Sequence, residues 1–238
     1  MEWNGFKIDE FEFEGMKARV VLPDSNASNG KWMLKTEYFN AFPDTEIALV
    51  NKGYHLCFIE NSTRWCADED LHRKERFCRF VVGKYNLCSK CVIVGMSCGG
   101  MIGVKFAALY PERVAVLYAD APVMNLLSCP YCLGTAKDKT MIEQFEKDTL
   151  MTLADVISYR NHPLDNMHIL LNNRIPILLV CGDSDDVVPY EENGKLLYDY
   201  YTANGGEIRL FLKPGVGHHP HGYPDVNALT EYIEAHNM

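Results

Sequence analysis

The residues best suited to do chemistry lie in the segment VGMSCGG (94–100), which contains the pattern G-x-S-x-G. An apolar run precedes it and a helical pattern follows it, which is the strand-turn-helix context that a nucleophilic serine needs. Gly95 and Gly99 carry no Cβ, so neighbouring backbone can approach the tight turn without a clash. The segment therefore predicts that Ser97 is a nucleophile at a helix N-terminus. The backbone N–H of Cys98 is then one donor to a developing oxyanion.

A serine hydroxyl needs a histidine to take its proton, and the histidine needs a carboxylate to orient it. Both residue types follow downstream in the order Ser, Asp, His. A predicted strand at 177–180 runs into CGDSDDVVP, and Asp185 in this loop is the predicted acid. Asp183 and Asp186 remain alternatives, as does Asp120 after a predicted strand at 114–119.

The predicted base lies in the loop GVGHHPH (215–221), after a predicted strand at 208–212. His218 follows the glycine-rich turn directly and is predicted to be the base. His219 and His221 are predicted to shape the pocket rim and contact substrate. Three histidines this close also fit a metal site, but the same loop holds no carboxylate or cysteine. We therefore predict no metal and no cofactor.

Short apolar runs alternate with amphipathic helical patterns along the chain, starting with a hairpin over 6–22 and a helical pattern over 35–52. This alternation predicts an α/β fold in which helices cover both faces of a mostly parallel sheet. Residues 122–173 break the rhythm, and we expect a small cap-like insertion there within a single domain spanning 1–238. Candidate pocket walls are Trp32, Met124 and Tyr131.

The elbow GMSCGG, the acid loop GDSDDVVP and the base loop GVGHHPH together resemble the α/β-hydrolase superfamily. The segments 31–43, 118–122 and 187–193 are similar to those of bacterial esterases and lipases of that superfamily. The resemblance implies an eight-stranded, mostly parallel sheet and hydrolysis through an acyl-enzyme. It also implies a second oxyanion donor between residues 32 and 35, with Met33 and Leu34 as the candidates.

These features favour a serine esterase that cleaves a small-molecule carboxylic ester. A peptidase related to the prolyl oligopeptidases and an acyltransferase are alternatives on the same scaffold. A binding protein that kept the fold without catalysis is an alternative of a different class, since fold does not fix function.

Composition limits the other classes of function. The net charge is −9 and no long Lys/Arg run is present, which argues against nucleic-acid binding and against attraction to anionic membranes. The sequence has no signal-peptide pattern and no run of roughly 18 apolar residues.

Cysteine usage indicates the compartment. Nine cysteines, an odd number in a chain too long to need disulfides, favour a reduced, cytoplasmic location. The pairs Cys88/Cys91 and Cys129/Cys132 have the C-x-x-C spacing of zinc and redox motifs, but we interpret them as incidental thiols.

Overall fold

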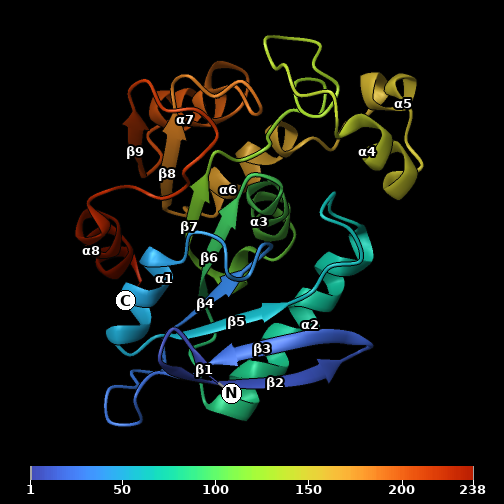
Figure 1. Ribbon diagram of the computed structural model, residues 1–238. Helices are drawn as coiled ribbons and strands as arrows, with labels where there is room; N and C mark the ends of the chain where they lie inside the picture. The colour runs from blue at the N-terminus through green and yellow to red at the C-terminus, as the bar shows by residue number, and fades with distance from the viewer. Residues whose placement is uncertain (1, 238) are drawn as a thin grey trace.

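The computed structural model describes residues 2–237, in which nine strands form one sheet in the order β1-β2-β3-β5-β4-β6-β7-β8-β9 (Figure 1). Pairing is antiparallel from β1 to β5 and parallel from β5 to β9. The strands are β1 (Glu2–Trp3), β2 (Phe6–Phe13), β3 (Met16–Val21), β4 (Trp32–Lys35), β5 (His55–Ile59), β6 (Cys91–Met96), β7 (Val114–Asp120), β8 (Ile177–Gly182) and β9 (Ile208–Lys213).

The helices cover both faces of the sheet, and this confirms the predicted α/β-hydrolase fold. They are α1 (Asp44–Asn51), α2 (Asp68–Tyr85), α3 (Cys98–Leu109), α4 (Ile142–Thr149), α5 (Leu153–Ser158), α6 (Met167–Asn172), α7 (Gly194–Ala203) and α8 (Val226–His236). Three short 3₁₀ segments, η1 (Pro111–Arg113), η2 (Pro163–Asn166) and η3 (Tyr190–Glu192), lie between them.

Two apolar layers fill the space between helices and sheet. One layer combines strand residues with α2, α3, α6 and α7, and includes Phe77 and Phe106. The other packs α1 and α8 on the opposite face, and includes Leu49 and Ile233. Strands buried on both faces, such as β6 and β8, are uniformly apolar for this reason.

The sheet has one strand more than the resemblance implied, because the two-residue β1 extends its antiparallel edge. The predicted hairpin is confirmed by the register of β2 and β3. The helix expected over 35–52 is wrong in extent, since only Asp44–Asn51 is helical. The preceding WMLK is instead β4, a central strand whose four residues are all buried.

The parallel strands place the chemistry. Because β4, β6, β7, β8 and β9 run in one direction, the loops that follow them meet at a single edge of the sheet. The segment 122–173, which carries α4, α5, η2 and α6, leaves β7 at this edge. Its assignment as a cap stays a prediction. Among residues 2–237, no helix is both long and apolar enough to cross a membrane.

Candidate active site

Ser97 occupies the turn between β6 and α3 in a strained backbone conformation. Its φ is 54° and its ψ is −120°, in a region that non-glycine residues rarely adopt. The end of β7 and the loop after it hold Ser97 there: Ser97 N donates to Asp120 O at 2.9 Å, and Val123 N donates to Ser97 O at 3.1 Å. Cys98 is the first residue of α3, where backbone N–H groups lack partners within the helix.

The glycines of the elbow are required by close approach of backbone. A Cβ on Gly95 would lie 2.4 Å from Gly99 O, and one on Gly100 would lie 2.5 Å from the Cβ of Pro122. Thr36 fastens the same turn from the loop after β4, because its hydroxyl donates to Gly99 O at 2.6 Å. The elbow therefore depends on small residues at fixed positions.

The structure brings the three predicted catalytic side chains together. His218 Nε2 lies 3.1 Å from Ser97 Oγ, and His218 Nδ1 lies 2.7 Å from Asp185 Oδ2. A carboxylate only accepts, so Nδ1–H of His218 donates to it and leaves Nε2 free to accept from Ser97. Asp185 Oδ1 accepts the backbone N–H groups of Val187 and Val188 at 2.9 and 2.8 Å, which fix its orientation.

The acid loop and the base loop are bonded to each other, which explains why one aspartate of three reaches the histidine. Ser184 N donates to Val216 O at 3.1 Å, and Gly215 N donates to the side chain of Asp183 at 2.7 Å. Asp183 is thereby used in holding the loops together. The Asp186 side chain is 56% exposed, and its contact with Lys137 is a loose 3.6 Å pair. Neither alternative acid contacts His218.

Asp120, the remaining alternative acid, supports a different histidine. His221 Nδ1 donates to Asp120 Oδ1 at 2.8 Å, and Gly222 N donates to Asp120 Oδ2 at 2.5 Å. Lys213 adds two more anchors to the base loop, since its Nζ donates to Pro220 O at 2.6 Å and to Gly222 O at 3.0 Å. The histidine loop is therefore fixed by Asp120 from β7 and by Lys213 from β9.

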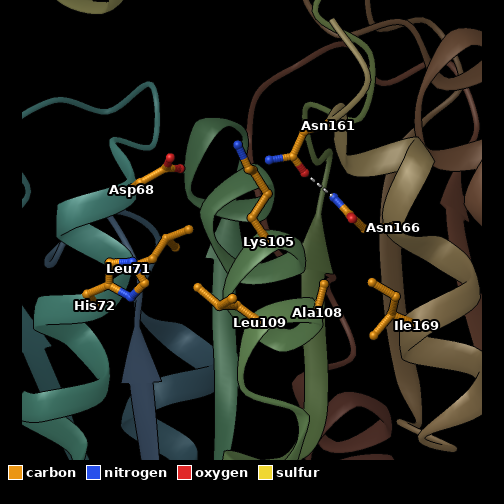
Figure 2. A pocket seen from close by; sticks show the side chains of 9 residues that line it. All are labelled: Asp68, Leu71, His72, Lys105, Ala108, Leu109, Asn161, Asn166 and Ile169. Atoms are coloured by element: carbon orange, nitrogen blue, oxygen red, sulfur yellow. Dashed lines mark hydrogen bonds between the residues drawn. The ribbon is translucent and has the colours of Figure 1, made fainter.

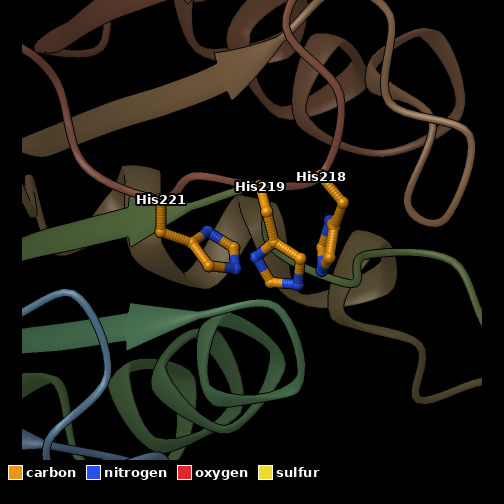
Figure 3. Close-up of side chains that lie close together, drawn as sticks. All are labelled: His218, His219 and His221. Carbon is orange, nitrogen blue, oxygen red and sulfur yellow. The ribbon is translucent and has the colours of Figure 1, made fainter.

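A pocket of about 510 Å³ opens at Ser97. His219 and His221 line it, and Figure 3 shows their rings beside that of His218. Their contact with substrate stays a prediction. Burial and the neighbouring imidazoles lower the pKa of His219. The remaining lining residues are Tyr38, Ala41, Phe42, Arg64, Met96, Asp138, Thr140, Met141 and Val187.

Sequence reasoning missed Tyr38, which lies in the loop after β4. Burial raises the pKa of its phenol well above the usual value, and the neighbouring Cys98 side chain raises it further. Burial also raises the pKa of the Cys98 thiol to about 11, so this thiol is neutral and does not compete with Ser97 as a nucleophile. Tyr38 thus presents a protonated donor beside the elbow.

Comparison with solved structures gives the same fold. An acylaminoacyl peptidase in complex with Z-Gly-Gly-Phe-chloromethyl ketone matches 98% of this chain with a TM-score of 0.75 and 16% identity. Pyrococcus horikoshii acylaminoacyl peptidase matches 98% with a TM-score of 0.71 and 14% identity. A puromycin hydrolase matches 97% with a TM-score of 0.68 and 16% identity. The chain spans only 38–42% of the length of these proteins.

The sequence match that decides the family covers residues 80–235, more than half of the chain, and is to the prolyl oligopeptidase family. The chain belongs to the prolyl oligopeptidase family. This family lies within the α/β-hydrolase superfamily, and the match supports a serine hydrolase. No curated protein matches the chain in sequence.

Two predicted oxyanion donors of this prolyl oligopeptidase family member are wrong. Met33 and Leu34 lie inside β4, which pairs with β5 on one side and β6 on the other. Both residues are fully buried at ladder positions, away from the edge where the loops meet. The error follows from the missed strand, since the loop that reaches the elbow begins only after Lys35.

The three predicted pocket walls are also wrong, because each is fixed in the core. Trp32 begins β4 at the end opposite the elbow, and its indole donates to Cys88 O at 2.8 Å. Met124 is fully buried, and its backbone N–H donates to Asn193. Tyr131 packs against Phe145 and donates to Glu146 at 3.0 Å.

The two C-x-x-C pairs, Cys88/Cys91 and Cys129/Cys132, lie in different surroundings. All nine cysteines, each within the described part of the chain, are free thiols. Cys88 is exposed before β6, whereas Cys129 is buried in the segment 122–173. That both pairs are incidental thiols stays a prediction.

A second hollow, of about 250 Å³, lies over α3 between α2 and α6 (Figure 2). Its rim is polar, with Asp68 on one side and the hydrogen-bonded pair Asn161 and Asn166 on the other. Lys105 points into it and donates to Tyr159 at 3.0 Å. Among residues 2–237, the two hollows share no lining residue, so this one is separate from the Ser97 pocket.

The space around two glycines, Gly95 in the elbow and Gly83 on α2, predicts opposite effects of glycine-to-alanine changes on stability. Gly95→Ala should lower the free energy of unfolding by about 1–3 kcal/mol, because its methyl group meets backbone that has no room to move. Gly83→Ala, on α2 with open space around it, should raise that free energy by about 0.5–1 kcal/mol. Urea denaturation of both variants checks this, and equal stability of the two would contradict the assigned contacts.

Proposed function

We propose that this chain is a serine acyl hydrolase that cleaves carboxylic esters through an acyl-enzyme on Ser97, with His218 as the base and Asp185 as the acid. The observation that carries the proposal is the continuous hydrogen-bonded path from Ser97 Oγ through both ring nitrogens of His218 to Asp185. The strained elbow, the open pocket and the family match support it.

In the proposed reaction, Ser97 Oγ attacks the acyl carbon as its proton passes to His218 Nε2. Asp185 stabilises the charged imidazolium that forms, because its carboxylate already accepts from Nδ1. His218 then gives the proton to the leaving alcohol oxygen, and the acyl C–O bond breaks. Water repeats the sequence on the acyl-enzyme and releases the carboxylic acid and Ser97.

The oxyanion is proposed to accept hydrogen bonds from the Cys98 backbone N–H and from the Tyr38 hydroxyl. Cys98 N–H belongs to the first turn of α3, where the helix dipole favours negative charge. Tyr38 enters the same pocket from the loop after β4, and burial keeps it protonated. The Cys98 N–H is the donor predicted from sequence, and the Tyr38 hydroxyl takes the place of the second donor that was expected within β4.

Cleavage of a peptide or aminoacyl bond is the second candidate, and the prolyl oligopeptidase family match favours it. The same three side chains can perform it, because His218 can protonate a leaving amine as well as an alcohol. The ratio of kcat/KM for p-nitrophenyl acetate to kcat/KM for aminoacyl p-nitroanilides separates the two candidates.

Ser97→Ala should lower kcat for p-nitrophenyl acetate by more than about 10⁴-fold, because it removes the attacking oxygen. Ser184→Ala is the matched control, since Ser184 is an exposed serine on the acid loop at the same edge of the sheet. Its kcat should equal that of the wild type. Full activity in Ser97→Ala would reject the proposed nucleophile.

Asp185→Asn should lower kcat by about 10⁴-fold, because an amide cannot hold His218 in the required tautomer. Asp186→Asn makes the same chemical change on the next residue. Its kcat should stay within about twofold of the wild-type value, because the Asp186 side chain is exposed. Steady-state kinetics on one ester compares them. Equal losses in both variants would mean that the acid has been assigned to the wrong residue.

Tyr38→Phe should lower kcat by about 10²–10³-fold and change KM little, because the lost hydroxyl is proposed to act mainly on the oxyanion. Tyr110→Phe is the control, as its hydroxyl contacts His72 outside the pocket. A Tyr38→Phe enzyme that keeps wild-type kcat would leave the second donor to a backbone group.

A further inference from the structure

Three imidazoles stand side by side on the loop after β9. The ring centroids of His218, His219 and His221 are 4.9 to 5.0 Å apart in every pairing. One nitrogen from each ring lies within 4.8 Å of the corresponding nitrogens of the other two. Figure 3 shows the three rings extending from the loop in the same direction. The proposed mechanism uses only one of them.

Two buried carboxylates orient the outer histidines in the same way. Asp185 accepts from Nδ1 of His218 at 2.7 Å, and Asp120 accepts from Nδ1 of His221 at 2.8 Å. Both carboxylate side chains are 1% exposed. Each bond places the hydrogen on Nδ1 and leaves the Nε2 lone pair directed away from the carboxylate. This is the arrangement in which metal-bound histidines are held in proteins.

From this arrangement we infer that the three histidines bind a zinc-like divalent ion. Its ligands are Nε2 of His218, Nε2 of His221 and one ring nitrogen of His219. The inference goes beyond the proposed hydrolysis, because the ion would inhibit the site rather than serve the reaction. The histidine loop itself contains no carboxylate. The carboxylates that orient its histidines come from other parts of the chain: Asp120 from the end of β7 and Asp185 from the acid loop.

Coordination requires the three ring nitrogens, which lie within 4.8 Å of one another, to move closer together. Zn–N bonds of 2.0–2.1 Å place tetrahedral nitrogens about 3.4 Å apart. His218 and His221 are held by their carboxylates, and Lys213 anchors the loop on either side of His221, at Pro220 and Gly222. His219 stacks on Phe42 with ring centroids 5.5 Å apart. Because His219 is the exposed member of the three, its ring has room to turn toward the other two. Imidazole ligands favour Zn²⁺, Cu²⁺ and Ni²⁺ over Mg²⁺ and Ca²⁺.

Metal binding and catalysis would compete for one lone pair. His218 Nε2 takes the proton of Ser97 in the proposed reaction, and it cannot do so while it coordinates an ion. Zn²⁺ is therefore expected to be a reversible inhibitor whose effect a chelator removes. This inhibitory part rests on the proposed function, whereas the binding part does not.

The binding test titrates metal-free protein with ZnCl₂ against a chromophoric chelator. The wild type should bind one equivalent, and both His219→Ala and the larger His219→Gln should raise the Kd at least about tenfold. His168→Ala, which removes an exposed histidine from α6, is the matched control and should leave the Kd unchanged. A Kd unaffected by both His219 variants, or no saturable binding, would overturn the inference.

Co²⁺ and activity complete the test. The Co²⁺ form should show the visible absorption of a tetrahedral nitrogen site, and a thiolate-to-metal charge-transfer band would instead assign binding to cysteines. Stoichiometric Zn²⁺ should abolish p-nitrophenyl acetate hydrolysis, EDTA should restore it, and Mg²⁺ should have no effect. Zn²⁺ binding at His219 without inhibition would overturn the inhibitory part. A chain that binds Zn²⁺ there but hydrolyses no substrate would instead count against the proposed function.

Discussion

The site depends on one set of hydrogen bonds, in which Ser97, His218 and Asp185 are joined in line across 121 positions of sequence. Each bond has a direction fixed by chemistry, since Asp185 only accepts and so determines which nitrogen of His218 faces the serine. The loops after β6, β8 and β9 supply these residues, and the parallel sheet brings those loops to one edge.

The surrounding structure restricts how these loops can move. The positive φ of Ser97 is held by bonds to the backbone of Asp120 and Val123, and the glycines beside it leave no space for a side chain. Gly182 plays the same part under the acid and base loops, where a Cβ would lie 2.1 Å from Val216 O. Such close backbone contacts fix the positions of these side chains, and they allow only glycine at the positions in contact, as expected for a preorganised site.

The elbow and the loops that carry Asp185 and His218 could be located in the sequence because each has a local signature. Ser97 lies between glycines after an apolar run, and His218 follows a glycine-rich turn. The preference for Asp185 over Asp183 and Asp186 had weaker support, since only the folded loops show which carboxylate faces the histidine. Asp120 as the orienting partner of His221 was not anticipated, because the end of β7 carries no local motif that marks a partner for a histidine.

The residues that line the Ser97 pocket, and Tyr38 as the proposed second oxyanion donor, could not be predicted for a physical reason. β4 is four buried residues long, too short to show the periodicity of a strand, so the loop after it was misplaced. Tyr38 and Phe42 enter the site from that loop. Trp32, Met124 and Tyr131 are as apolar or aromatic as pocket residues, but burial alone does not distinguish a core side chain from a pocket wall.

The chemistry of Ser97 can be measured directly with a fluorophosphonate probe, followed by mass spectrometry of the labelled peptides. A serine activated by His218 should give one adduct per chain, on Ser97, and His218→Gln should reduce the labelling rate by more than about 10³-fold. An unlabelled Ser97 in the folded wild-type protein, or the same labelling rate in His218→Gln, would contradict the proposed catalytic site.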